Sequence, residues 1–195
     1  MYLLLLCSLT VAAIAIDRFL LYRRASQGAR ALEADVAAAL RKKKLDEVAP
    51  AVKGKDNMVA HLIQSAVDAR AAGEDVPMTL EAVYGEAAML LRARLNYLST
   101  IVTLAPLLGL LGTISGMIQS FSVFNLQAGQ PMAITGGIGE ALIATATGLL
   151  VAIFALVVHT YFAQRMDTML TLLEKTMNTM LAGFAANDGG RSHAS

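Results

Sequence analysis

The most constraining feature of this chain is the distribution of its charged side chains. No Asp, Glu, Lys or Arg occurs in the 45 residues between Arg94 and Glu140, or in the 24 residues between Glu140 and Arg165. A helix that crosses the roughly 30 Å of bilayer hydrocarbon needs about 20 apolar residues. The two gaps therefore predict membrane spans at about 98–123 and 138–162, joined by a polar connection at 125–137.

A third apolar stretch, residues 2–22, is interrupted only by Asp17 and Arg18. A cleaved signal peptide is the alternative, but no basic segment precedes the stretch and the apolar run resumes after Arg18. The composition agrees with three spans, because 56% of the residues are hydrophobic and 16% are charged. We expect Arg18 to lie at the inner end of the first span and to reach water.

The basic residues predict the orientation, since they concentrate on the cytoplasmic side of membrane proteins. Residues 23–97 hold 12 of the 16 Lys and Arg residues, whereas 125–139 hold none. The prediction is an all-α protein of the inner membrane, with a periplasmic N-terminus and a cytoplasmic C-terminus. Its expected segments are a first span (1–24), a cytoplasmic helical segment (25–76), a long helix with the second span (77–124), the periplasmic connection (125–137), a long helix with the third span (138–186) and a disordered tail (187–195).

Several function classes are disfavoured. The single cysteine, Cys7, excludes a disulfide scaffold, and no metal-ligand or nucleotide-binding motif occurs. A net charge of +1 gives no field that would attract nucleic acid. Ser115 and His159 do not form a catalytic dyad, because a rise of 1.5 Å per residue puts them about 25 Å and about 6 Å from the inner ends of their spans. We expect no catalytic residue, no metal and no cofactor.

Small residues recur at helical spacing in both central spans. Such residues let helix backbones approach closely in a membrane. Close packing is one explanation of these stripes, and a pore-lining face is the other. Pro106 is expected to kink the second span. The residues concerned are Gly109, Gly112, Gly116 and Ser120 in the second span, and Ala141, Thr145, Gly148, Ala152, Ala155 and His159 in the third.

The polar residues of these spans suggest a proton pathway. With the same rise per residue, Thr113 lies about 22 Å and Thr145 about 27 Å from the inner ends, so their hydroxyls are expected at a similar level. Glu140, at about 34 Å, is either a functional carboxylate or a group wetted at the outer interface. His159 is either an interfacial anchor or a proton exit. No other titratable side chain lies between Glu140 and His159, so a partner would supply the one needed in mid-membrane.

Three motifs resemble the ExbB/TolQ/MotA proton-channel family. The run from Leu104 to Phe121, LAPLLGLLGTISGMIQSF, is similar to the family's second-span signature, and GEALIATATG, from Gly139 to Gly148, is similar to its third. Asp17-Arg18 resembles the acidic-Arg pair that ends the first span. The resemblance covers most of residues 10–185.

The resemblance implies a ring, typically a pentamer, around the single spans of an ExbD- or TolR-like dimer. That partner carries the essential, proton-binding Asp. Proton-motive force would drive rotation that works on periplasmic machinery through a TonB- or TolA-like protein. Thr113 and Thr145 would line the pore, Glu140 would stand at the proton entrance, and Pro106 and Gly109 would shape the second span.

The chain departs from the flagellar MotA pattern of four spans, and it begins almost at its first span, so no preceding periplasmic domain is expected. An ExbB-like motor subunit is slightly favoured over a TolQ-like or gliding-type one. A non-conducting membrane scaffold remains the alternative from another class. A solute transporter is weaker, since no internal repeat is present.

Overall fold

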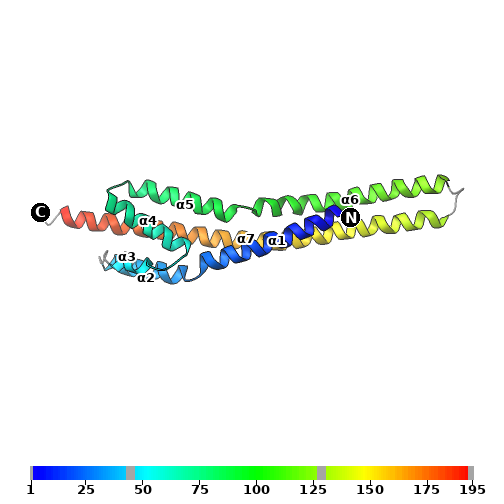
Figure 1. Cartoon of the computed structure of the whole chain (residues 1–195). Coiled ribbons are helices and arrows are strands. Elements are labelled where there is room, and N and C mark those ends of the chain that lie inside the picture. Colours follow the sequence, from blue (N-terminus) through cyan, green and yellow to red (C-terminus); the bar gives the residue numbers. More distant parts are fainter. Residues whose placement is uncertain (1, 43–46, 127–130, 193–195) are drawn as a thin grey trace. The chain divides into compact units, whose positions relative to one another are not determined.

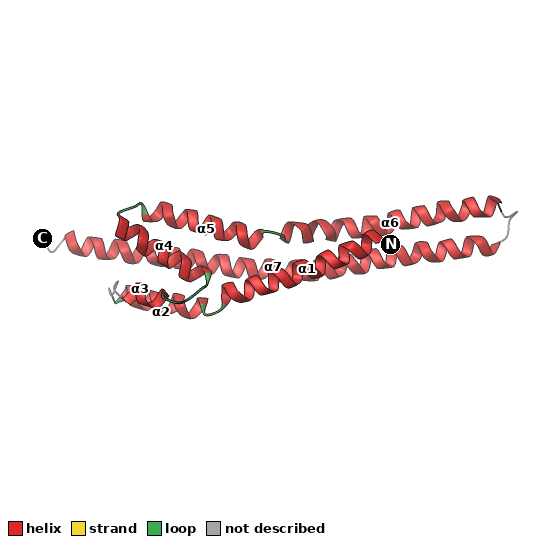
Figure 2. Cartoon of the chain, viewed as in Figure 1, coloured by secondary structure: helices red, strands yellow, loops and turns green. Residues whose placement is uncertain are grey.

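The protein is entirely helical over the residues that its computed structural model describes, which are 2–42, 47–126 and 131–192 (Figures 1 and 2). Three helical stretches are long and apolar enough to cross a membrane, within Tyr2–Arg41, Val76–Ser122 and Gly136–Asn187. This confirms the predicted all-α membrane protein with three apolar spans. The helices are α1 (Tyr2–Ser26), α2 (Ala29–Arg41), α3 (Val48–Val52), α4 (Met58–Ala72), α5 (Val76–Arg92), α6 (Leu95–Leu126) and α7 (Pro131–Ser192).

The chain divides into two compact units. One, here called the span unit, comprises Met1–Arg18 and Arg94–Ala163. The other, the cytoplasmic unit of the predicted topology, comprises Phe19–Ala93 and Gln164–Ser195. The span unit exposes most of its large apolar side chains, as expected of helices that meet lipid or other apolar helices.

The cytoplasmic unit has an apolar core built from amphipathic helices. On these helices, side chains three or four residues apart are buried, which is the pattern of an amphipathic helix packed on a core. An ion pair lies at the edge of this core, where Nζ of the exposed Lys175 is 3.2 Å from Oε1 of the buried Glu33. The core side chains include Leu32, Val36 and Leu40 of α2, Leu62, Ile63 and Ala66 of α4, and Leu173, Met180 and Phe184 of α7.

Local sequence signals fix both ends of α4 and the start of α5. The Asn57 side chain caps α4 by accepting a hydrogen bond from the Ala60 N–H at 2.8 Å. Gly73, with a φ of 73°, ends that helix in the left-handed region that glycine adopts without strain. Asp75 then caps α5 by accepting from the Met78 N–H at 3.1 Å.

The long helix expected at 77–124 is interrupted. Helix α5 ends at Arg92 and α6 begins at Leu95, with Arg94 in the left-handed region at a φ of 67°. Neither Ala93 nor Arg94 is a helix-breaking residue type, so local propensity does not predict the break. Residues of α1 contact both sides of the break, Asp17 at Arg94 and Tyr22 at Leu91.

The connection expected at 125–137 is also shorter. Helix α6 reaches Leu126 and α7 begins at Pro131, a residue type favoured in the first turn of a helix; residues 127–130 lie outside the described residues. Helix α7 continues to Ser192, past the expected end at 186. Of the tail expected at 187–195, residues 193–195 lie outside the described residues.

Candidate functional site

Helices α6 and α7 meet within the span unit through glycines that face backbone atoms. A Cβ added at Gly148 would lie 2.6 Å from the Ala105 carbonyl oxygen and 3.0 Å from the Gly109 Cα. A Cβ at Gly109 would lie 3.1 Å from the Ala144 carbonyl oxygen. Real Cβ atoms almost never lie as close as the 2.6 Å at Gly148, so a side chain there would push the two backbones apart, and the approach at Gly109 is tighter than most real Cβ contacts.

The same close approach continues toward the ends of α6 and α7 that the connection joins. A Cβ at Gly112 would lie 2.7 Å from the Ala144 Cβ, and one at Gly116 would lie 3.2 Å from the Ala141 Cβ. We call this contact the glycine seam; it comprises Ala105, Gly109, Gly112, Gly116 and Ser120 of α6 and Gly137, Ala141, Ala144, Thr145 and Gly148 of α7. Small residues at helical spacing therefore lie at a direct backbone contact.

Of the two threonines of the sequence hypothesis, Thr145 belongs to the glycine seam, and Thr113 is the sequence neighbour of one of its glycines. Thr113 follows Gly112 and Thr145 follows Ala144, and these two neighbours face each other. The Thr145 hydroxyl donates to the Gly109 carbonyl oxygen across the seam at 3.3 Å. The Thr113 hydroxyl donates to the Leu110 carbonyl oxygen of its own helix at 2.7 Å. Their role in proton transfer stays a prediction.

The other proposed pathway residues are more widely separated. Glu140 is exposed, and it precedes Thr145 by five residues, which is about 7.5 Å along a helix. His159 is partly exposed and follows Thr145 by 14 residues, about 21 Å along α7. The structure thus places Thr145 at the contact between α6 and α7, with Glu140 about one and a half turns away along α7 and His159 remote.

Pro106 lies inside α6, which continues through it from Leu95 to Leu126. It directly follows Ala105, whose carbonyl oxygen makes the tightest approach to Gly148. A proline removes one backbone donor from the helix, so the Val102 carbonyl loses its usual intrahelical partner.

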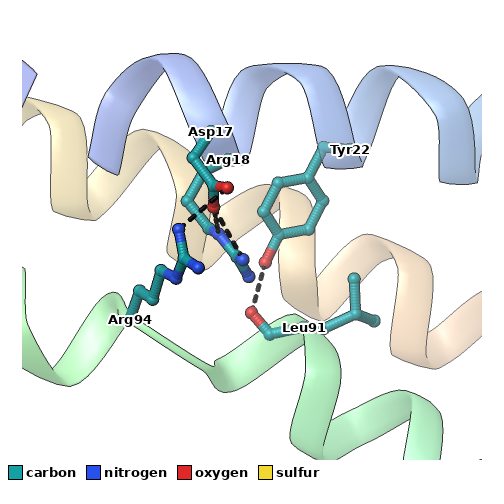
Figure 3. A network of polar contacts seen from close by, with 5 residues as sticks. All are labelled: Asp17, Arg18, Tyr22, Leu91 and Arg94. Atoms are coloured by element: carbon teal, nitrogen blue, oxygen red, sulfur yellow. Dashed lines mark hydrogen bonds and ion pairs between the residues drawn. The ribbon is translucent and has the colours of Figure 1, made fainter. Parts of the chain in front are cut away.

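A second polar feature of the span unit was only partly foreseen (Figure 3). Arg18 donates to Asp17 Oδ2 from Nε at 2.9 Å and from Nη2 at 2.8 Å, and Arg94 Nη1 lies 2.8 Å from Asp17 Oδ1. The expectation that Arg18 reaches water is wrong, because its side chain is 5% exposed. Its burial is possible because an adjacent carboxylate neutralises it. The ion pair between Asp17 and Arg94 joins residues 77 positions apart, and no pattern in the sequence predicts it.

Three helices are long and apolar enough to span a membrane, and two of them meet at the glycine seam, so the fold is that of a helical membrane protein with close helix packing. The sequence model of the MotA/TolQ/ExbB proton channel family matches residues 51–175, which is more than half of the chain. The chain therefore belongs to this family, which confirms the resemblance drawn from the motifs. The family is one of proton channels.

Individual relatives agree with this assignment. The chain is 55% identical over 65 residues to a protein named ExbB-like 1 of Synechocystis sp., a match that covers 31% of this chain and 26% of the relative. It is 33% identical over 108 residues to the Tol-Pal system protein TolQ of Pseudomonas aeruginosa, covering 55% and 47%. It is 39% identical over 74 residues to the biopolymer transport protein ExbB of Salmonella typhimurium, covering 37% and 30%. These matches span less than half of each relative.

Proposed function

We propose that this chain is the ring-forming stator subunit of a proton-driven motor of the ExbB–ExbD type. In this proposal, it couples proton flow through the bacterial inner membrane to work on periplasmic or outer-membrane machinery, such as TonB-dependent import. The N-terminus is periplasmic and the C-terminus cytoplasmic. The ring is a pentamer, and its partner is an ExbD/TolR-like single-span protein with an essential Asp.

One observation carries the proposal. The Thr145 hydroxyl lies at a close contact between two apolar helices, while no titratable side chain lies between Glu140 and His159 in the sequence. Hydroxyl groups orient water or pass a proton along, but they do not hold a charge near neutral pH. A carboxylate from a partner would complete the path at this level.

A TolQ-like role in the Tol-Pal system is the second candidate. It is favoured by the match to TolQ of Pseudomonas aeruginosa, which covers 55% of this chain, more than the 37% covered by the ExbB match from Salmonella typhimurium. Co-purification decides between the two candidates. A stable complex with an ExbD-like protein and not with a TolR-like one favours the first, and the reverse favours the second.

Proton flux in proteoliposomes tests the conduction step. The chain is co-expressed with the single-span, Asp-bearing protein encoded nearest to it, and the mass of the complex is measured first. Thr145→Val removes the hydroxyl at the glycine seam and is expected to lower the flux at least tenfold, a loss within the range of proton-transfer groups. Thr145→Ser keeps the hydroxyl and is expected to retain most of the flux.

Thr147→Val is the matched control. Thr147 lies two residues away on α7, and its hydroxyl donates to the Ile143 carbonyl oxygen of the same helix at 2.7 Å. Its removal is expected to leave the flux unchanged. Full flux in a normally assembled Thr145→Val complex would contradict the conducting role and would favour a non-conducting scaffold, in which the glycine seam only packs α6 against α7.

A further inference from the structure

The break between α5 and α6 has no local cause in the sequence. Ala93 and Arg94 are both good helix formers, yet Ala93 has a ψ of 139° and Arg94 a φ of 67°. Among the described residues other than glycine, Arg94 is the one with a positive φ. A residue with a Cβ disfavours this left-handed conformation, so contacts from elsewhere in the chain must hold it.

One such contact lies on the α6 side of the break, within the span unit. Arg94 Nη1 lies 2.8 Å from Asp17 Oδ1 of α1. The other oxygen of the same carboxylate accepts two hydrogen bonds from Arg18 (Figure 3). Asp17 therefore keeps a cationic partner whether or not Arg94 is bound.

The other contact lies on the α5 side, within the cytoplasmic unit. The buried Tyr22 hydroxyl donates to the Leu91 carbonyl oxygen at 2.8 Å. In an unbroken helix this carbonyl would accept from the Leu95 N–H, four residues on. Tyr22 thus supplies the hydrogen bond that the break removes, and α1 contributes a partner on each side.

We propose that Ala93–Arg94 is a two-state joint between the cytoplasmic helix α5 and the second span. In the broken state, Asp17 and Tyr22 hold Arg94 and Leu91 as observed. In the unbroken state, the Arg94 backbone adopts the φ and ψ of a right-handed helix. The Leu95 N–H then replaces the Tyr22 hydroxyl as the donor to the Leu91 carbonyl.

Two polar groups keep a partner in both states. The Leu91 carbonyl accepts from the Tyr22 hydroxyl in the broken state and from the Leu95 N–H in the unbroken one, and Asp17 retains Arg18 in both. The division between the two compact units also falls between Ala93 and Arg94. The joint is independent of proton conduction, and its test does not measure flux.

A pair of variants at one position separates backbone preference from charge. Arg94→Ala and Arg94→Gly both remove the guanidinium, but only glycine adopts a positive φ without strain. Spin labels are placed at the exposed positions Ala82 and Ser99 in a Cys7→Ser background, with the full chain in lipid nanodiscs. Pulsed electron paramagnetic resonance then measures the distance between them. An unbroken helix puts their Cα atoms about 26 Å apart, at 1.5 Å for each of the 17 residues.

Arg94→Ala is expected to populate the unbroken distance at least about fivefold more than Arg94→Gly does, relative to the broken one. Tyr22→Phe, which removes a single oxygen atom, is expected to shift the distribution in the same direction as Arg94→Ala. Far-UV circular dichroism and elution volume establish that each variant is folded. Identical distance distributions in the wild type, Arg94→Ala, Arg94→Gly and Tyr22→Phe would overturn the proposal.

Discussion

The glycine seam makes a sharp prediction for Gly148→Ala. The new Cβ would lie 2.6 Å from the Ala105 carbonyl oxygen, whereas ordinary contacts begin at 3.4 Å, so α6 and α7 must separate locally by about 0.8 Å. A gap of this size forfeits a quarter to a half of the dispersion energy of each opposed pair of atoms. Overpacking of this kind costs about 1–3 kcal/mol of stability.

Gly139→Ala is the matched control, because a Cβ added at Gly139 of α7 meets no atom within 4 Å. Both variants gain the same preference of alanine for the helix, up to about 1 kcal/mol. The difference between them therefore isolates the steric effect, and Gly148→Ala is expected to be less stable by about 1–3 kcal/mol.

The assay is reversible unfolding in mixed micelles with an increasing fraction of sodium dodecyl sulfate, followed by far-UV circular dichroism. The free energy of unfolding is compared between the two alanine variants and the wild type. Equal stability of Gly148→Ala and Gly139→Ala would refute the backbone contact as described.

Two further predictions concern the cytoplasmic unit, and both are measured by the same unfolding assay. Asn57→Ala removes the cap on Ala60 and the hydrogen bond to the Gln27 carbonyl oxygen at 3.1 Å, so it should cost about 1–2 kcal/mol. Asn57→Asp, which keeps the cap acceptor, should cost less; equal losses would contradict the capping role. Lys175→Met leaves the buried Glu33 carboxylate without its ion-pair partner and should destabilise the fold by about 1 kcal/mol. In a Glu33→Gln background the same change should cost little, and an undiminished cost would show that the pair is not the cause.

The spans and the seam residues could be predicted because their signals are local. The absence of charge on either side of Glu140 marks two apolar helices, and the spacing of Gly109, Gly112 and Gly116 marks one helix face. Those residues lie at the α6–α7 contact. The hydrogen bond from Thr145 to the Gly109 carbonyl depends on the register between two helices, which spacing along one helix does not specify.

The break at Ala93–Arg94 and the burial of Arg18 could not be predicted in the same way. Residues 93 and 94 favour a continuous helix, and the groups that pair with the broken ends, Asp17 and Tyr22, lie about seventy residues earlier. Arg18 is covered because α1 packs within the span unit, whereas a lone Arg at a span end is ordinarily expected to reach the interface. Tertiary contact overrides local preference at both places.

The close approach at Gly148 also limits how this chain can evolve. Glycine is the one standard amino acid without a Cβ, so every missense change at this codon introduces the atom that the Ala105 carbonyl leaves no room for. The codon for Gly139, nine residues earlier on the same helix, carries no such restriction. Within this chain, a new side chain therefore meets no neighbour at Gly139, whereas at Gly148 it displaces α6 unless a second substitution in α6 makes room.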